Sequence, residues 1–364
     1  YPMPWESDGE PQLAFAGCPH FSKQQLCIWT DRLMEGLTKN GRDKVVLPMI
    51  FCAAPDVIEA FNKEIAAAGI HEEVKVIKTG CFGMCAEGPI VMICPEHIMY
   101  TKVTEEDVRE IFNEHILGGK VVKRLMASEN EHEEIQDRLP KIPFYSMQKR
   151  IALLNCGIID PENIEEYIAL DGYQALAKVL NEMEPDDVID EIKKSGLRGR
   201  GGGGFPTGRK WESSAVVQDH EKYVICNADE GDPGAFMDRS ILEGDPHKVL
   251  EAMAICGYAV GANTGYIYIR AEYPLAIERL QAAIKQAESI GVLGENILGT
   301  DFSFNIELKY GAGAFVCGEE TALLESIEGR RGQPRLKPPF PANAGLFQKP
   351  TLINNVETYA NITK

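Results

Sequence analysis

The chain has 364 residues, 44% of them hydrophobic, which is enough for two or three domains with cores of their own. Its 37 basic and 55 acidic residues give a net charge of −18, and so acidic a protein repels the phosphates of nucleic acids. No apolar run of about 18 residues occurs, so we expect no membrane span. Residues 1–10 are acidic and Pro-rich, unlike a secretory signal peptide.

Ten cysteines in a chain without a secretory signal favour metal or redox chemistry, or buried thiols, over a disulfide framework. We therefore expect a cytoplasmic protein. Cys156, Cys226, Cys256 and Cys317 stand singly in apolar or Gly-rich surroundings, where a free cysteine packs as a small hydrophobic residue.

The N-terminal part predicts a small thioredoxin-like α/β domain over residues 45–126, after an extension at 1–44. Its elements alternate in character: strand 45–51, helix 55–68, strand 74–78, a cysteine-bearing glycine loop at 80–89, strand 90–93 and helix 105–115. Thr104 and the acidic residues after it suit the positive start of that last helix. The charged, Pro-punctuated residues 127–150 indicate a linker.

A second α/β domain is predicted over residues 151–355, with 356–364 beginning a further one. The pattern gives helices at 173–182, 185–195, 247–259, 275–289 and 319–329, and strands at 223–227, 266–269 and 304–310. Strands that alternate with helices indicate a Rossmann-like, doubly wound parallel sheet.

The most conspicuous segment of this domain is the glycine loop, Gly199–Gly208. It contains a formal G-x-G-x-x-G pattern, but it follows a helical stretch where a dinucleotide fingerprint would follow a strand. Its glycines let backbone N–H groups crowd an anion or a flat ring, and Arg200, Arg209 and Lys210 supply positive charge. A flexible linker is the alternative, which Phe205 and Trp211 disfavour.

Three further segments carry polar groups into loops. Asn227, Asp229 and Glu230 follow a predicted strand, where α/β sheets bind ligands, although a solvated turn has the same composition. Glu319 and Glu320 follow a second glycine loop, 311–318, where they either complement a helix dipole or bind ribose hydroxyls. The last is the Pro-rich segment 334–341 with Lys337 and Phe340, followed by the pair Asn354 and Asn355.

In this order the four segments resemble the flavin-binding subunit of respiratory complex I and its relatives in NAD(P)-linked and electron-bifurcating hydrogenases and formate dehydrogenases. The resemblance runs from about Arg150 to Lys364. Residues 152–180 and the preceding thioredoxin-like domain are more similar to the hydrogenase-type β subunit. Two positions depart from the pattern: Ser213 stands where relatives carry an aromatic residue, and Gly231-Asp232 replaces a Ser-Glu pair.

The resemblance implies two sets of cofactor-binding residues. FMN would be held by Gly199, Arg200, Gly201, Gly202, Lys210, Asn227, Asp229, Glu230, Gly318, Asn354 and Asn355. The nicotinamide nucleotide would be held by Phe205, Glu319, Glu320, Lys337 and Phe340. Hydride transfer between stacked rings needs no general acid or base, so no catalytic side chain is expected. Carboxylates near the ribose favour NADH over NADPH.

Within the thioredoxin-like domain, Cys81 and Cys85 resemble half of a 2Fe–2S site, and relatives add two cysteines after the first strand. Here only Cys52 stands at that position. Either the loop is shortened and the cluster lost, or a stretch is missing from the sequence; Cys18 or Cys27 could also supply a ligand.

The expected function is that of an NADH dehydrogenase (diaphorase) module in a multi-subunit iron–sulfur oxidoreductase, with electron bifurcation as one form that such a complex takes. It would pass electrons from FMN to the clusters of partner subunits or to ferredoxin. The chain is expected to be truncated before the ubiquitin-like and 4Fe–4S domains of its relatives. A structural subunit without cluster chemistry and a stand-alone FMN reductase remain the alternatives.

Overall fold

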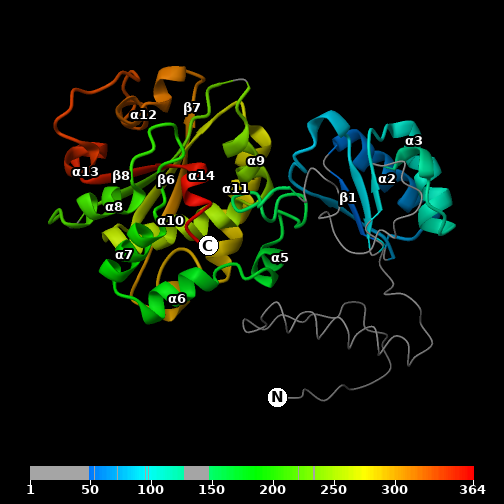
Figure 1. Cartoon of the computed structure of the whole chain (residues 1–364), viewed down its shortest axis with the longest axis horizontal. Helices are drawn as coiled ribbons and strands as arrows, with labels where there is room; N and C mark the ends of the chain where they lie inside the picture. The colour runs from blue at the N-terminus through cyan, green and yellow to red at the C-terminus, as the bar shows by residue number, and fades with distance from the viewer. Residues whose placement is uncertain are drawn as a thin grey trace, which may run out of the picture. The chain divides into compact units, whose positions relative to one another are not determined.

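The computed structural model describes residues 49–52, 54–71, 73–94, 96, 98–126, 147–219, 221–232 and 234–364, and of 49–52 only the backbone. All of them lie in the compact unit Val45–Lys364 (Figure 1). The predicted extension 1–44, the greater part of the predicted linker, and both Cys18 and Cys27 lie outside the described residues. The domain boundaries stay a prediction. Across the described ranges, no helix combines the length and the apolar character needed to cross a bilayer.

The thioredoxin-like fold expected for the first domain is confirmed by its sheet, in the order β2-β1-β3-β4. Strand β1 runs parallel to β2 and antiparallel to β3. The strands are β1 (Met49–Cys52), β2 (Lys75–Lys78), β3 (Val91–Cys94) and β4 (Ile98–Tyr100). The helices are α2 (Pro55–Ala68) and α3 (Glu105–Glu110), which continues as a π-helical turn to Leu117, with 3-10 turns at Cys85–Glu87 and Lys123–Leu125.

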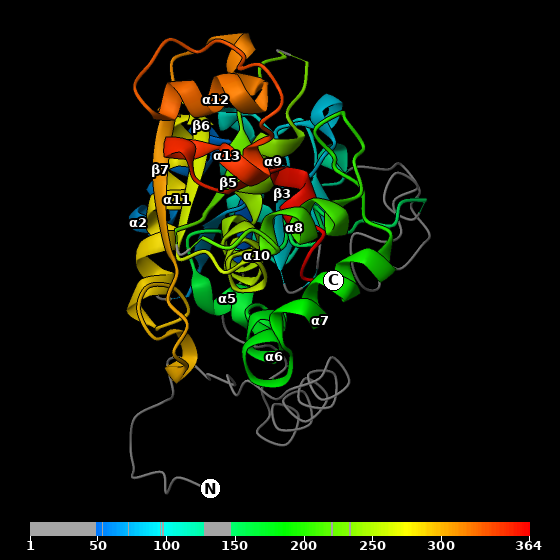
Figure 2. The same cartoon turned by 90° about the vertical axis from the view of Figure 1, so that its left-hand side faces the viewer.

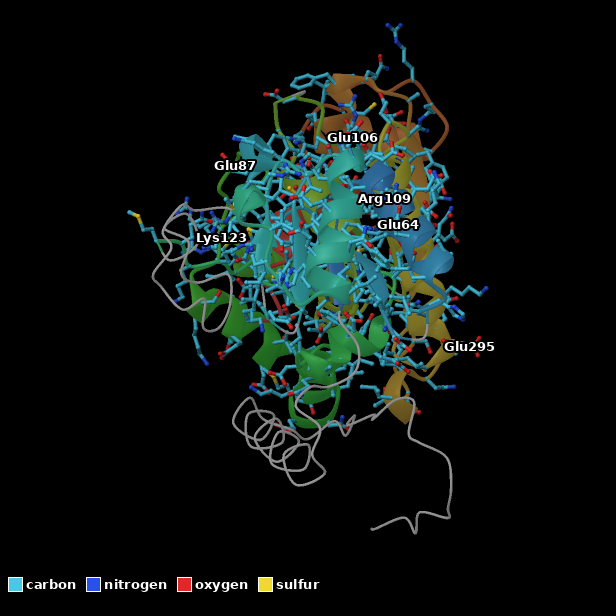
Figure 3. All side chains as sticks on the ribbon, turned by 90° about the vertical axis from the view of Figure 1, so that its right-hand side faces the viewer. Glu64, Glu87, Glu106, Arg109, Lys123 and Glu295 are labelled. Atoms are coloured by element: carbon cyan, nitrogen blue, oxygen red, sulfur yellow. The ribbon has the colours of Figure 1, made fainter. Side chains whose placement is uncertain are left out.

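Local signals explain both helices. Pro55 opens α2 at a position that needs no N–H donor, and Gly69 ends it with φ 71°, a backbone conformation that glycine adopts without strain. Thr104 and Asp107 form a capping box at the start of α3. The buried side chains of the two helices join those of β3 and β4 in one apolar core. Figure 3 shows Glu64 of α2 and Glu106 and Arg109 of α3 on the outer side of these helices.

The second domain is built on a parallel sheet in the order β7-β6-β5-β8, which confirms the Rossmann-like expectation. The strands are β5 (Tyr223–Ala228), β6 (Thr264–Arg270), β7 (Asn305–Gly311) and β8 (Thr351–Asn355). The helices are α5 (Ile164–Ala169), α6 (Gln174–Glu182), α7 (Pro185–Ser195), α8 (Thr207–Ala215), α9 (Met237–Gly244), α10 (Pro246–Val260), α11 (Pro274–Ser289), α12 (Glu320–Ile327), α13 (Pro341–Ala344) and α14 (Val356–Tyr359). Three 3-10 turns complete it: Ile297–Gly299, Phe315–Gly318 and Leu346–Gln348.

Both faces of this sheet are covered, so its strands are apolar on both sides. Val224 and Cys226 of β5 belong to the large core that contains α10, whereas Ile225 belongs to a smaller core with Leu323 and Leu324 of α12. Figure 2 shows α12 beyond the ends of β6 and β7, at the edge where the parallel strands finish. Ligand-binding loops in such sheets lie at this edge.

The central helix α10 is buried almost all round and still carries charged residues. Glu251 is 1% exposed and accepts hydrogen bonds from the Tyr167 hydroxyl at 2.5 Å and from the backbone N–H groups of Tyr173 at 2.9 Å and Leu176 at 3.1 Å. Lys248 donates to the carbonyl of Ile151 at 2.7 Å. These bonds tie residues 151–176, which precede the sheet in sequence, to its central helix.

Candidate functional site

The order of the second sheet creates a switch point between β5 and β8. The chain runs from β5 outward to β6 and β7 and then returns to β8 on the other side of β5. In such sheets the crevice beside the carboxyl ends at the switch point is the usual ligand site. Asn227 of β5 and Asn355 of β8 pair in register at this edge. Two residues selected from the sequence, 128 positions apart (355 − 227), thus lie side by side.

The glycine loop lies between α7 and α8 and has a closed backbone. The Gly199 N–H donates to the Phe205 carbonyl at 2.8 Å, and the Thr207 N–H donates to the Leu197 carbonyl at 2.9 Å. Arg198 holds the tip by a 2.7 Å bond from Nε to the Gly204 carbonyl. The loop is therefore an ordered hairpin-like turn, which rules out the flexible-linker alternative.

This loop adjoins the switch point. A Cβ added to Gly201 would lie 3.1 Å from Cβ of Asn355, and the Arg200 N–H donates to Thr358 Oγ1 at 2.9 Å. Gly202 has φ 98°, which an L residue adopts only with strain. No atom lies within 4 Å of a Cβ added to Gly202 or Gly203, so this stretch of backbone has open space in front of it. Such a cradle suits the close approach of a flat or phosphorylated ligand.

The acidic loop after β5 is held from several sides. Asn227 Nδ2 donates to the Gly318 carbonyl at 2.9 Å, and Asn227 Oδ1 accepts from the Asp229 N–H at 3.1 Å. The Glu230 carboxylate accepts from the N–H groups of Asp238 at 3.1 Å and Arg239 at 3.2 Å, so it caps the start of α9. The loop joins the glycine turn before α12 to the crevice, and its bonds show that it is not a merely solvated turn.

Asp229 is the residue of this loop whose side chain lacks a full set of partners. Its Oδ2 is buried and makes no hydrogen bond. Burial raises the pKa of Asp229 to about 6, against the opposing effect of Arg270, and Glu272 adds to the rise. A buried carboxylate oxygen without a donor is costly unless a ligand supplies one. Asp229 therefore fits a ligand that brings an N–H or O–H group.

Four predicted residues meet in one charge cluster at the start of α12. Lys337 Nζ lies 3.1 Å from Glu319 Oε1 and 2.8 Å from Glu320 Oε1, and Lys210 Nζ lies 3.2 Å from Glu320 Oε2. Glu319 also caps α12 by accepting from the N–H groups of Thr321 and Ala322. Burial acts to raise the pKa of Glu320, but Lys210 and Lys337 outweigh it and the net shift is downward. Both carboxylates are thus held as anions.

The charge cluster joins the two predicted sets of residues. The resemblance assigns Lys210 to the flavin and Glu320 to the nucleotide, and the two side chains form an ion pair. Phe205 and Phe340 are 57% and 55% exposed, so neither ring is used in the core and both are available to a ligand.

The asparagine pair makes its side-chain bonds within the protein. Asn355 Nδ2 donates to Asp238 Oδ2 at 2.7 Å, and its Oδ1 accepts from the Glu357 N–H at 2.9 Å, at the start of α14. In the orientation that satisfies both of its amide groups, Asn354 accepts from Trp211 Nε1 at 3.1 Å. The amides thus fix the end of β8 against α8, α9 and α14, and their role toward a cofactor stays a prediction.

Two residues near the crevice were not anticipated from the sequence. Asp238, at the start of α9, accepts a hydrogen bond from the side-chain amide of Asn355. Arg270, at the end of β6, donates from Nη1 to the Glu230 carbonyl at 3.1 Å. Neither stands in a glycine-rich or otherwise distinctive segment. The position of Arg270 at a strand end was the one signal that could have indicated it.

The predicted metal ligands lie in the first domain, Cys52 at the end of β1 and Cys81 and Cys85 between β2 and β3. Cys52 pairs in register with Lys78 and with Val91, which flank the loop that carries Cys81 and Cys85. The Gly83 N–H donates to Cys81 Sγ at 3.2 Å, and burial raises the pKa of the Cys81 thiol. Within the described residues no group of three metal-binding side chains occurs. A 2Fe–2S cluster takes four ligands, and the described side chains offer two, so we derive no step through it.

Comparison with known proteins finds similarity in the C-terminal part of the chain. Residues 192–364 match the Nuo51 FMN-binding domain model. The NADP-reducing hydrogenase subunit HndC of Solidesulfovibrio fructosivorans is 66% identical over 215 residues, 59% of this chain and 44% of that protein. A subunit of the NADH-quinone oxidoreductase of Rhizobium meliloti (strain 1021) is 53% identical over 214 residues, 59% of this chain and 51% of that protein.

The chain thus spans about half the length of these curated relatives. A solved NAD+-reducing NiFe-hydrogenase in the H2-reduced state is 27% identical, with a TM-score of 0.48, over 87% of this chain and 52% of that one. The family match contains the glycine loop, both acidic segments and the asparagine pair. Residues 192–364 are therefore similar to the Nuo51 FMN-binding domain family.

Proposed function

We propose that this chain is the NADH-oxidising, FMN-binding electron-input subunit of a multi-subunit iron–sulfur oxidoreductase. The observation that carries the proposal is the set of groups around the carboxyl ends of β5 and β8. An open glycine backbone, the unpartnered Asp229 oxygen and a cluster of lysines and glutamates converge there. These are the features that a phosphorylated, hydrogen-bonding ring system needs, and the residues that carry them lie within the range that matches the FMN-binding domain model.

The groups of the crevice divide by their chemistry. Gly199, Gly201 and Gly202 would admit the flavin to the backbone, and Arg200 and Lys210 would balance its phosphate. Asp229 would accept a hydrogen bond from an N–H of the ring or from a ribityl hydroxyl. Bound FMN would supply the redox chemistry, namely hydride acceptance from NADH and release of single electrons to iron–sulfur centres.

The nucleotide end would be formed by the exposed rings and by the charge cluster. Phe205 and Phe340 offer faces on which the rings of the nucleotide can stack. Glu319 and Glu320 would accept bonds from ribose hydroxyls, and as anions they would repel the 2′-phosphate of NADPH. Lys337 holds both carboxylates in place. These side chains orient the nucleotide, and none of them transfers a proton.

The partners are proposed from the relatives. The HndC relative is named as a hydrogenase subunit and the Rhizobium relative as a subunit of a quinone oxidoreductase. We favour a hydrogenase-type complex, because the more similar of these two relatives is the hydrogenase subunit. The 2Fe–2S cluster, the 4Fe–4S cluster of a following segment, ferredoxin as a partner and electron bifurcation stay proposals. So does the cytoplasm as location.

The experiment that tests the function uses the purified full chain. We expect it to bind one equivalent of FMN, and NADH added without oxygen to bleach the visible absorbance of the flavin. A chain that binds no FMN would be a structural subunit. Rapid reduction of soluble dyes by a preparation without iron or partners would instead indicate a stand-alone FMN reductase.

A first prediction concerns the pH dependence of FMN binding. The pKa of Asp229 is raised to about 6 in the free chain, so below that pH the carboxyl is protonated and loses the negative charge that strengthens an accepted hydrogen bond. A donor from the flavin stabilises the ionised form and lowers this pKa in the complex. FMN affinity should therefore be constant above about pH 6 and fall by up to about tenfold per pH unit below it.

The measurement is fluorescence titration of FMN between pH 5 and 8. Asp229→Asn keeps an acceptor oxygen but does not titrate, so the fall below pH 6 should disappear. Asp232→Asn is the matched control, because Asp232 is exposed in the same loop and bonds only to Gly234 N–H among the contacts described for its side chain. If Asp229→Asn keeps the wild-type pH profile, Asp229 does not contact the flavin.

A further inference from the structure

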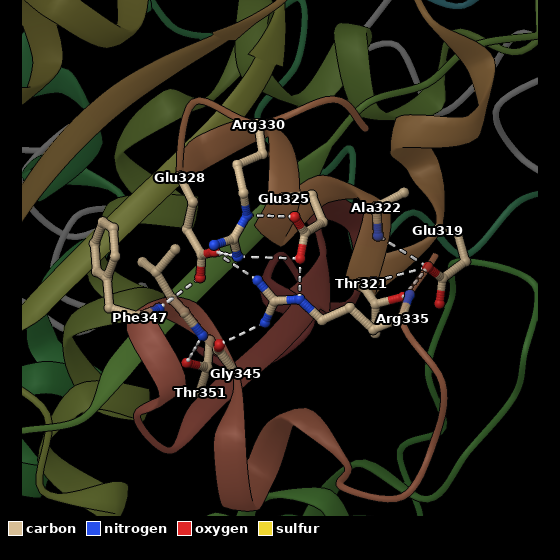
Figure 4. Close-up of polar contacts among 11 residues, drawn as sticks. Glu319, Thr321, Ala322, Glu325, Glu328, Arg330, Arg335, Gly345, Phe347 and Thr351 are labelled. Carbon is tan, nitrogen blue, oxygen red and sulfur yellow. Dashed lines mark hydrogen bonds and ion pairs between the residues drawn. The ribbon is translucent and has the colours of Figure 1, made fainter. Parts of the chain in front are cut away.

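A second cluster of charges, at the end of α12, is not used by the proposed function. Glu325 lies in the last turn of α12, and Glu328 directly follows the helix. Each of the two carboxylates forms ion pairs with both Arg330 and Arg335 (Figure 4). The two arginines differ in burial: the side chain of Arg330 is 55% exposed and that of Arg335 is 18% exposed. The carboxylate of Glu328 is almost fully buried, with a side-chain exposure of 4%.

Arg335 uses its whole guanidinium group. Nε donates to Glu325 Oε1, Nη2 donates to Glu328 Oε2 at 2.7 Å, and Nη1 donates to the Gly345 carbonyl at 2.7 Å. A lysine cannot reproduce this planar, three-way arrangement. Arg335 therefore joins α12 to the turn that precedes β8, the strand that ends in the asparagine pair.

The backbone of Arg335 closes a second connection. Its N–H donates to Thr321 Oγ1 at 2.8 Å, and the Thr321 hydroxyl donates to Glu319 Oε2. The other oxygen of Glu319 accepts from Lys337 Nζ at 3.1 Å. Arg335 and Lys337 are two residues apart in the chain, so these bonds form a closed ring through Thr321 and Glu319.

Apolar packing contributes little to the part of this segment between Arg335 and Lys337. Leu336, which lies between the two cations, is 93% exposed and buries almost no apolar surface. Residues 330–340 contain no helix or strand, so they also lack a ladder of backbone hydrogen bonds. The polar contacts of Arg335 and Lys337 therefore fix the path of the chain around Leu336.

We infer that Arg335 is a positioning residue of the nucleotide site: it sets the ammonium group of Lys337 and the carboxylate of Glu319 for an NADH-class dinucleotide. This inference rests on the proposed function and names the residue that orders its nucleotide end. Arg335 touches neither cofactor. Its loss leaves the flavin loop, which is built from α7, α8 and the end of β8, in place.

The test compares Arg335→Gln with Arg330→Gln, which removes the exposed arginine from the same two glutamates. NADH binding to the FMN-free full chain is measured by calorimetry, FMN binding by fluorescence, and KM and kcat by NADH–dye reduction. For Arg335→Gln we expect the NADH Kd and KM to rise about tenfold, the loss expected for a charge-assisted hydrogen bond. FMN Kd and kcat should change by less than about threefold, and Arg330→Gln should match the wild type.

A second pair of variants covers the case in which Arg335→Gln does not fold. Thr321→Val removes the hydroxyl between Arg335 and Glu319 at nearly constant volume, and Thr321→Ser keeps it. Thr321→Val should raise the NADH Kd and Thr321→Ser should not.

Two results would overturn the inference: equal NADH affinity within each pair, or a parallel loss of FMN and NADH affinity in Arg335→Gln. Failure of the proposed function is a separate outcome, because the wild-type chain itself would then bind no FMN and give no reaction with NADH.

Discussion

Glu251→Ala is expected to lower the free energy of unfolding of the second domain by about 3–5 kcal/mol. The carboxylate is 1% exposed and accepts from one tyrosine hydroxyl and from the backbone N–H groups of Tyr173 and Leu176. Alanine leaves these three donors buried without an acceptor and opens a cavity beside α10. The melting temperature should fall by about 10 °C.

The measurement is urea denaturation followed by circular dichroism, with Glu251→Gln and Glu278→Ala as comparisons. Glutamine keeps one acceptor oxygen, so its loss should be smaller than that of alanine. Glu278 is exposed on α11, and its replacement should change stability by less than about 0.5 kcal/mol. A Glu251→Ala chain as stable as Glu278→Ala would mean that residues 151–176 are not held through this carboxylate.

The helices of this protein were largely predictable because their ends carry local signals. Pro55 and Gly69 bound α2, and Pro185 and Gly196 bound α7, so the expected and observed limits of both helices agree. In contrast, α9 was not predicted. Its orphan N–H groups bond to Glu230, seven residues before the helix starts at Met237, and no capping pattern at that spacing can be found in a sequence.

Strand β8 was missed for a different reason. It has five residues, follows a Pro-rich segment, and owes its place to pairing with β5, which precedes it by more than a hundred residues. Strand order is not encoded locally, so no pattern in the chain indicated that Asn227 lies beside Asn355. The resemblance selected both residues for contacts with the flavin, and that role stays a prediction; in the structure their amides also bond within the protein.

The charge cluster illustrates the same limit. Lys210, Glu320 and Lys337 were each selected from separate segments, and Lys210 and Glu320 are 110 residues apart. Their mutual ion pairs follow from the sheet, which brings α8 and the start of α12 to one edge. Sequence motifs identified these residues. Only the fold could show that an ion pair joins a residue of the flavin set, Lys210, to a residue of the nucleotide set, Glu320.

Gly203→Val is expected to weaken FMN binding by about a hundredfold or more while leaving the stability of the FMN-free chain unchanged. A Cβ at Gly203 meets no atom within 4 Å, and Gly203 is not among the glycines with positive φ, so the free loop accepts a side chain. A flavin that lies against the backbone would collide with it. Gly203→Ala should give a smaller loss, because alanine projects less far.

Gly202→Ala is the comparison that distinguishes a loss of stability through backbone strain from a loss of FMN binding through a steric clash. Gly202 has φ 98°, so alanine there should cost about 1–2 kcal/mol whether or not FMN is present. Thermal melting of the FMN-free chain should therefore distinguish Gly202→Ala from both Gly203 variants, and fluorescence titration should rank the Gly203 variants by side-chain size. If Gly203→Val binds FMN as tightly as the wild type, the open face of the loop is not the flavin site. The phosphate and ring would then have to lie elsewhere along the β5–β8 crevice, with Asp229 as the next group to test.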